Sequence, residues 1–269
     1  MKMVSAAKLK RAQDAVTQMR PYAEKLQAIL QNLSVGLDME ENPYSEQREV
    51  KDILMVLVSS NRGLCGGFNN QIIKQSRVII EQNTTKNIHV LALGKKAFEK
   101  YKKEDSLATE EFGPNPYGLQ DNLNFEETAM MAEAIMEQFK KGRYDKVLLV
   151  YNSFKNAAVQ YCITEQFLPI APPEMEAGEE ASAIDYIFEP GKMEIVEQLV
   201  PQSLKIQLFK ALLDSTASEH GARMTAMHKA TDNATELSKE LKLTYNKARQ
   251  AAITAEILEI VGGAEALNN

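Results

Sequence analysis

The first 37 residues contain a stripe of ten positions at alternating steps of four and three, and nine of these positions are apolar. The stripe begins at Ser5 and continues through Leu9, Ala12, Val16, Met19, Ala23, Leu26, Leu30, Leu33 and Leu37. This heptad pattern predicts one long helix over residues 1–37. Pro21 lies within the stripe, so we expect a kink at this proline and not an end, because the apolar positions continue beyond it.

The last 69 residues repeat the pattern over a greater length. The stripe runs from Ile206 to Gly262, and no proline occurs between positions 203 and 261. We expect Pro201 to be the first helical residue, where its missing N–H does no harm, and Gly262 with Gly263 to loosen or end the helix. The helix predicted over 201–269 is several times longer than an average helix of about 11–12 residues.

The middle of the chain, residues 38–200, has a different pattern. Apolar runs at 52–59, 88–93 and 146–151 are typical of buried strands, and weaker runs at 159–164 and 183–188 of edge strands. Helical patterns at 70–82, 95–103 and 125–141 alternate with them, whereas 105–124 and 169–182 have the composition of loops. The alternation predicts an α/β knob, Rossmann-like, with a largely parallel sheet.

The three segments together predict an architecture. Because the two ends of a domain usually lie close together, the terminal helices are expected to pair as a long antiparallel two-helix coiled coil, with the α/β knob inserted at one end. The helix over 201–269 is longer than its counterpart over 1–37. About 25–30 residues, near 240–267, are then expected to have no partner within the chain, so their apolar stripe requires a partner protein.

Composition and charge narrow the functional classes. The chain has 269 residues, 44% hydrophobic, with 31 Lys+Arg against 37 Asp+Glu and a net charge of −6. These values disfavour a disordered chain and a general nucleic-acid binder. No apolar run reaches the length of a membrane-spanning helix, and the two cysteines cannot build a disulfide framework, which indicates a reducing cytoplasm.

One glycine-rich segment deserves a chemical interpretation. Residues 59–70 (SSNRGLCGGFNN) follow a predicted strand and precede a predicted helix, where phosphate-binding loops occur. The segment lacks the Gly-Lys-Ser/Thr ending of a P-loop and the spacing of a dinucleotide site, so a tight turn that needs glycine is favoured over a nucleotide-dependent enzyme. A nucleophilic role for Cys65 is less favoured than a structural one. We expect no catalytic constellation, no cofactor site and no metal site.

Polar residues on the predicted C-terminal helix are the remaining signal. They are Arg223, Asn246, Lys247, Arg249, Gln250 and Thr254. They form either a solvated helix face or an interaction surface, and Arg249 with Gln250 offers fixed donors suited to a carboxylate or a backbone carbonyl. A coiled-coil adaptor that dimerises with a second copy is another hypothesis.

Several stretches resemble the γ subunit of bacterial F-type ATP synthases. They are residues 1–9 (MKMVSAAKL), 59–70, 222–234 (ARMTAMHKATDNA), 245–254 (YNKARQAAIT) and 259–264 (EIVGGA). Family members usually begin about two dozen residues earlier, and Met1 opens a helix without a cap, so we expect this sequence to start at an internal methionine. Asn61 stands where many relatives have Asp.

The resemblance implies a non-catalytic rotor, without cofactors, that turns inside a hexamer of three α and three β subunits. It implies contacts with the ε subunit and the membrane c-ring, and a peripheral location at the cytoplasmic face of the bacterial membrane through the complex alone. It also implies that the shaft drives the β subunits through successive conformations. The residues matching Arg249, Gln250 and Thr254 bind a β-subunit loop as a catch, and those matching Met1 and Arg223 influence coupling near the β lever.

Overall fold

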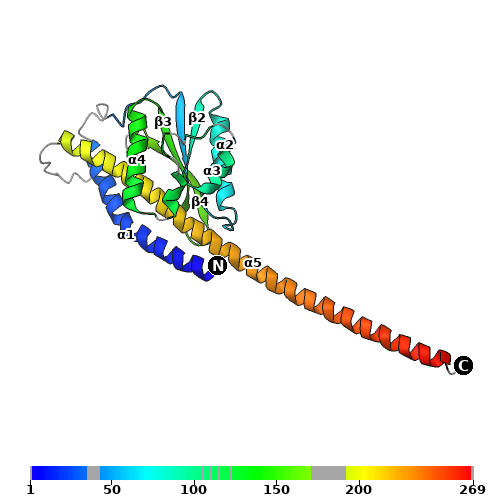
Figure 1. Ribbon diagram of the computed structural model, residues 1–269. Helices are drawn as coiled ribbons and strands as arrows, with labels where there is room; N and C mark the ends of the chain where they lie inside the picture. The colour runs from blue at the N-terminus through cyan, green and yellow to red at the C-terminus, as the bar shows by residue number, and fades with distance from the viewer. Residues whose placement is uncertain are drawn as a thin grey trace, which may run out of the picture. The chain divides into compact units, whose positions relative to one another are not determined.

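The computed structural model describes residues 2–34, 43–103, 106–108, 111–113, 116–121, 123–170 and 192–267. The chain divides into two units, residues 1–225 and 226–269. The first unit contains the sheet and its covering helices, and the second contains the C-terminal part of the last helix, α5 (Figure 1).

A four-stranded sheet of order β2-β1-β3-β4 forms the centre of the first unit. Its strands are β1 (Asp52–Leu57), β2 (Asn87–Ala92), β3 (Lys146–Phe154) and β4 (Gln160–Leu168). β1 pairs in parallel with β2 and β3, whereas the edge strand β4 is antiparallel to β3. The prediction of a largely parallel sheet with a weaker edge strand near 159–164 is therefore confirmed, and the strand predicted at 183–188 lies outside the described residues.

Helices cover both faces of this sheet, which explains why β1 is apolar from Ile53 to Leu57. Met55 and Leu57 point to a cluster formed with α2 (Phe68–Gln82) and α3 (Lys95–Tyr101). Leu54 and Val56 point to the opposite face and pack with α4 (Phe125–Lys140) and α5 (Lys192–Leu267). The alternation of side chains along one strand thus builds two separate cores (Figure 1).

The helix boundaries follow the sequence closely in the α/β part. α2, α3 and α4 begin and end within two residues of the helical patterns at 70–82, 95–103 and 125–141. At the start of α4, the Asn124 side chain accepts a hydrogen bond from the Glu127 amide and caps the helix. The predicted loop at 105–124 contains a short 3-10 helix, η2 (Pro116–Gln120), which its proline and glycine content did not indicate.

The N-terminal helix α1 (Lys2–Ser34) contains Pro21 and continues beyond it, as the stripe predicted. Leu9 and Ala12 of α1 form a buried cluster with Ala217 of α5. Figure 1 shows α1 lying beside the part of α5 that belongs to the first unit. Residues 35–37 of the predicted helix lie outside the described residues.

The predicted start of the last helix is wrong. α5 begins at Lys192, so Pro201 lies inside the helix and not at its first position. The flanking Val200 and Leu204 are almost fully buried in the sheet core, and this burial outweighs a cost of about 3 kcal/mol for the proline. The helix also continues through Gly262 and Gly263 to Leu267, because each glycine costs a helix only about 1 kcal/mol.

In the described part of the chain, no helix is apolar enough over 18 residues to cross a membrane.

Candidate functional site

The glycine-rich loop over 59–70 is stabilised by hydrogen bonds between its own residues. Ser60 Oγ donates to the Arg62 carbonyl at 2.6 Å, and Asn69 Nδ2 donates to Ser60 Oγ at 2.8 Å and lies 3.2 Å from Cys65 Sγ. Gly66 has a φ of 59°, in the left-handed region that favours glycine. Cys65 is buried against α2 and α3, in agreement with a structural role.

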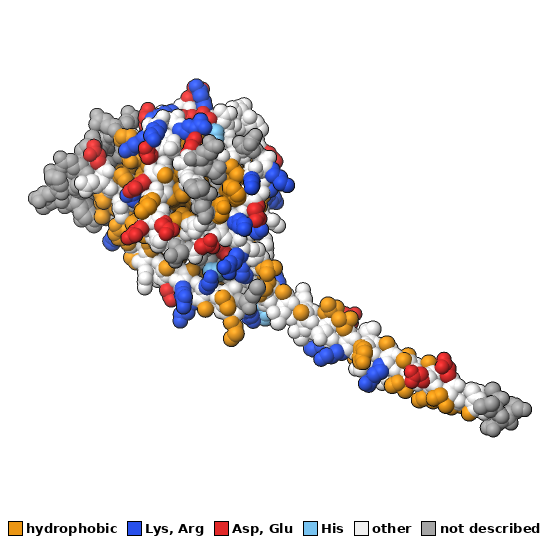
Figure 2. Space-filling model, in the orientation of Figure 1, with side chains coloured by type: hydrophobic (Ala, Val, Ile, Leu, Met, Phe, Trp, Pro, Cys, Tyr) orange, Lys and Arg blue, Asp and Glu red, His pale blue; other side chains and the backbone are white. Residues whose placement is uncertain are grey.

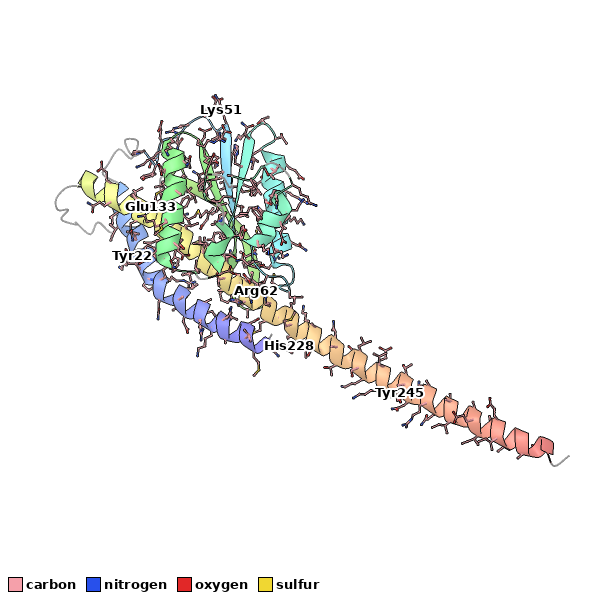
Figure 3. The ribbon with its side chains drawn as sticks, viewed as in Figure 1. Tyr22, Lys51, Arg62, Glu133, His228 and Tyr245 are labelled. Atoms are coloured by element: carbon pink, nitrogen blue, oxygen red, sulfur yellow. The ribbon has the colours of Figure 1, made fainter. Side chains whose placement is uncertain are left out.

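The loop borders a cavity of about 360 Å³ inside the first unit. The cavity wall combines α1, the loop, the end of η2 and α5, and Figure 3 places Arg62 where the loop lies beside α5. Its lining residues are Val4, Ser5, Lys8, Asn61, Arg62, Gly63, Leu64, Gln120, Asp121, Thr216, Glu219, His220 and Arg223. Segments that are far apart in the sequence therefore meet at this loop.

Arg223 of α5 is the most heavily bonded residue of the cavity wall. Its Nε and Nη2 donate to the Gly63 carbonyl, both at 3.3 Å, and Nη2 also donates to the Arg62 carbonyl at 3.1 Å. Its Nη1 lies 2.6 Å from Glu219 Oε1 and 3.3 Å from His220 Nδ1. Glu219, four residues before Arg223, lies on the same helix face and holds the guanidinium against the loop.

Burial shapes the charges around Arg223. It raises the pKa of the Glu219 carboxyl, while the Arg223 guanidinium acts in the opposite direction. Burial and the positive charge of Arg223 lower the pKa of His220 to about 4. His220 is then neutral at pH 7, and its Nδ1 accepts the hydrogen bond from Arg223.

The helix of the second unit is uncovered by other described residues. Every residue from 228 to 265 is exposed. Figure 2 shows hydrophobic side chains along this helix among charged ones, and Figure 3 shows Tyr245 on it. The large apolar residues concerned are Leu237, Leu241, Leu243, Tyr245, Ile253, Ile257, Leu258, Ile260 and Val261.

The three predicted catch residues lie on this helix. Arg249, Gln250 and Thr254 are all exposed. The Thr254 hydroxyl donates to the Gln250 carbonyl at 2.9 Å, whereas the side chains of Arg249 and Gln250 have no partner among the described residues. Arg223 belongs to the first unit, and Met1 lies outside the described residues.

Comparison with known proteins identifies the family. The family described as ATP synthase matches residues 1–267. The ATP synthase gamma chain of Flavobacterium johnsoniae is 59% identical over 269 residues, which are 100% of this chain and 92% of that relative. The chain belongs to the ATP synthase γ-chain family. The gamma chain of Christiangramia forsetii is 57% identical over 270 residues, with 100% of this chain and 92% of that relative covered.

Solved structures share the fold at lower identity. The central stalk/c-ring structure of the Tetrahymena thermophila mitochondrial ATP synthase matches with a TM-score of 0.63 and 22% identity, over 86% of this chain and 97% of that chain. The Euglena gracilis mitochondrial ATP synthase in rotational state 3 matches with a TM-score of 0.58 and 19% identity, over 99% of this chain and 94% of that chain.

Membership of the γ-chain family makes the chain the rotor subunit of an F-type ATP synthase, in the F1 part of that membrane-bound complex, and not a catalytic subunit. The enzyme interpretation of the loop at 59–70 is therefore set aside. In the described residues, no group of three or more His, Cys, Asp or Glu side chains is arranged to hold a metal ion.

Sequence reasoning selected some site residues of this γ chain and missed others. Arg223 was selected, but its partner Glu219 was not, although the spacing of four residues was a signal. Asn61, which stands where many relatives have Asp, is a second residue whose role the sequence does not reveal. Its amide donates to the Tyr117 carbonyl at 3.1 Å and to Asp121 Oδ1 at 2.9 Å, which an aspartate cannot do.

Proposed function

We propose that this γ chain is the shaft that rotates inside the hexamer of three α and three β subunits. Its N- and C-terminal helices pair as an antiparallel coiled coil, and the α/β unit is inserted at one end of the pair. The cluster of Leu9 and Ala12 with Ala217 supports the pairing. Rotation couples ion flow through the membrane c-ring to ATP synthesis or hydrolysis.

The exposed apolar residues of the second unit carry this proposal. A helix with nine large apolar side chains exposed to water presents an apolar surface of the kind that marks an interaction site. The α and β subunits would cover this helix and remove those side chains from water. The two solved neighbours belong to a central stalk with c-ring and to an assembly of F1 with c-ring, which supports the c-ring as the other partner.

The coupling requires no chemistry from the shaft itself. A shaft that contacts one β subunit differently from the next shifts the conformational equilibrium of each, and with it the relative affinities for ADP, phosphate and ATP. Arg249 and Gln250 offer unpartnered donors for a β-subunit loop. The hydroxyl of Thr254 already donates to its own helix, so it would accept a hydrogen bond from the partner. Met1 and Arg223 would influence coupling near the β lever.

The ε subunit is the further partner, beside the c-ring. The location that follows is peripheral, at the cytoplasmic face of the bacterial cell membrane, with membrane association through the complex alone.

The proposal is tested by removing the catch donors. We expect Arg249→Ala combined with Gln250→Ala to weaken binding to α and β subunits roughly tenfold or more, because each lost charge-assisted or buried hydrogen bond costs about 1–3 kcal/mol. The measurement is co-purification with the protein's own α and β subunits, followed by ATPase activity of the complex. The thermal unfolding of the α/β unit should not change.

The matched control is Ser238→Ala combined with Lys239→Ala, which also removes one neutral and one positively charged polar side chain from the exposed helix. This control should assemble as the unmodified chain does. Assembly and ATPase activity that are unchanged in the Arg249 and Gln250 variant would contradict the proposed catch.

A further inference from the structure

The side chain of Arg223 has no hydrogen-bond donor left for a partner protein. A guanidinium carries five N–H groups. The N–H group on Nε and the two on Nη2 face the carbonyls of Arg62 and Gly63. The two N–H groups on Nη1 face Glu219 and His220. The side chain is also only 10% exposed.

We propose that Arg223 is a positioning residue: it fixes the backbone of the loop at Arg62 and Gly63, and through it the exposed side chain of Leu64. Its influence on coupling is then exerted by the loop and not by a direct contact of the guanidinium with a partner subunit. This inference rests on the proposed function of the chain as a rotor.

Leu64 shows that the loop is held in a conformation that its sequence does not prefer. Its φ is 63°, in the left-handed region that L side chains rarely adopt. Its side chain is nevertheless 61% exposed, so it packs into no core that would stabilise this conformation. A strained backbone persists only where its surroundings determine it, and such residues cluster at functional sites.

The loop is fixed from two sides next to Leu64. Ser60 Oγ bonds to the Arg62 carbonyl from within the loop, and Arg223 bonds to the same carbonyl and to that of Gly63 from α5. Together these bonds determine the two peptide groups that precede Leu64. The loop therefore presents one large apolar side chain to the cavity, which is also lined by Val4 of α1, 62% exposed.

The ion pair between Arg223 and Glu219 decides which substitution of Arg223 can test the proposal. Removing the charge of Arg223 would leave Glu219 buried without a cation and would destabilise the unit for that reason alone. Arg223→Lys keeps a positive charge beside Glu219, but an ammonium cannot span both loop carbonyls as the planar guanidinium does. Leu64→Gly keeps every donor of Arg223 in place and removes both the exposed side chain and the cost of the left-handed backbone.

The experiment uses the complete ATP synthase in sealed vesicles, with Arg223→Lys, Leu64→Gly and the double variant. Two quantities are measured: ions pumped per ATP hydrolysed, and hydrogen exchange of the Ser60 and Phe68 amides, which are hydrogen-bonded within the loop, in the assembled complex. Arg223→Lys should raise the exchange rate of these amides about tenfold. The variant loses about one charge-assisted hydrogen bond to the loop, and the free energy of opening the loop falls by a corresponding amount. Pumping per ATP should fall roughly twofold or more in each single variant, and the double variant should equal the stronger single one, because both act through one loop.

Arg77→Lys, on the exposed face of α2, is the matched control and should change neither quantity. The inference is overturned if Arg223→Lys lowers pumping while loop exchange stays unchanged. It is equally overturned if Leu64→Gly pumps as the unmodified complex does, or if the two effects multiply in the double variant. If Arg223→Lys does not assemble, Leu64→Gly alone decides. Failure of the proposed function shows separately, as an unmodified chain that does not co-purify with its α and β subunits, whereas normal assembly of the Arg249 and Gln250 variant contradicts only the catch.

Discussion

Replacing Gly94 by alanine should destabilise the α/β unit through a steric conflict between two backbones. Gly94 precedes α3, and the residue that faces it is Ser59, just beyond the end of β1. A Cβ at position 94 would lie 1.9 Å from the Ser59 carbonyl oxygen and 2.5 Å from both the Ser59 carbonyl carbon and Oγ. The φ of Gly94, 164°, is extended backbone that any residue adopts, so the cost is one of space and not of torsion.

The magnitude follows from the separation required. An ordinary contact needs at least 3.4 Å, so the end of β1 and the start of α3 must move apart by about 1.5 Å. The bond from the Ala97 amide to Ser59 Oγ, at 2.8 Å, and that from the Lys96 amide to the Ser60 carbonyl, at 3.1 Å, join these two segments. Overpacking of about 1–3 kcal/mol, with about 1 kcal/mol for each weakened hydrogen bond, predicts a loss of about 3–5 kcal/mol in the free energy of unfolding.

The assay is urea unfolding followed by the near-UV signal of tyrosines. The chain has no Trp, and Tyr101, Tyr144 and Tyr151 are almost fully buried in the α/β unit. Gly67→Ala is the matched control, because its Cβ would meet open space at a φ of −80°, and it should be neutral or stabilising by about 0.4–1 kcal/mol. Equal unfolding midpoints for the two variants at equal slopes would refute the reasoning.

Two further predictions concern α5. His220→Gln should reduce the loss of stability between pH 7 and pH 5 by about 1–2 kcal/mol, measured by urea unfolding at both pH values. The pKa of His220 is lowered to about 4 in the native chain, so between pH 7 and pH 5 the unfolded chain gains a proton that the native chain does not, and stability falls. Glu219 and Asp214, whose pKa values are raised, contribute equally to the pH dependence of the unmodified chain and of the variant. Leu212→Ala should lower the free energy of unfolding by about 2–5 kcal/mol, because Leu212 is fully buried in the sheet core. Leu237→Ala, 55% exposed on the same helix, should change it by no more than about 0.5 kcal/mol, and equal effects of the two leucine variants would contradict the assigned burial.

The sequence predicted the elements of the α/β unit because local signals and tertiary packing agree there. Residues 53–57 are apolar without alternation, and a strand covered on both faces requires that pattern. The start of α5 differs from the prediction because a local stop signal is outweighed by tertiary packing. Pro201 is a local stop signal, but burial of Val200 and Leu204 in the core continues the helix through it.

The candidate site was predictable only in part, for a related reason. Periodicity and resemblance selected Arg223 and the loop at 59–70 separately, but no sequence pattern records that residues 160 positions apart are bonded. The left-handed backbone of Leu64 was also invisible, since local propensity assigns that conformation to the glycines around it.

The bond between Arg223 and the loop and the left-handed backbone of Leu64 could not be predicted for one physical reason. The backbone at Leu64 is not chosen by Leu64: it is determined by carbonyls that Ser60 holds from within the loop and Arg223 holds from α5. A backbone conformation that is fixed by residues outside a segment cannot be predicted from the local sequence of that segment. The same dependence makes the loop sensitive to its helix, since a displacement of α5 at Arg223 would be transmitted to the two peptide groups before Leu64. In the proposed rotor, this bonded contact would couple α5 directly to the loop of the α/β unit.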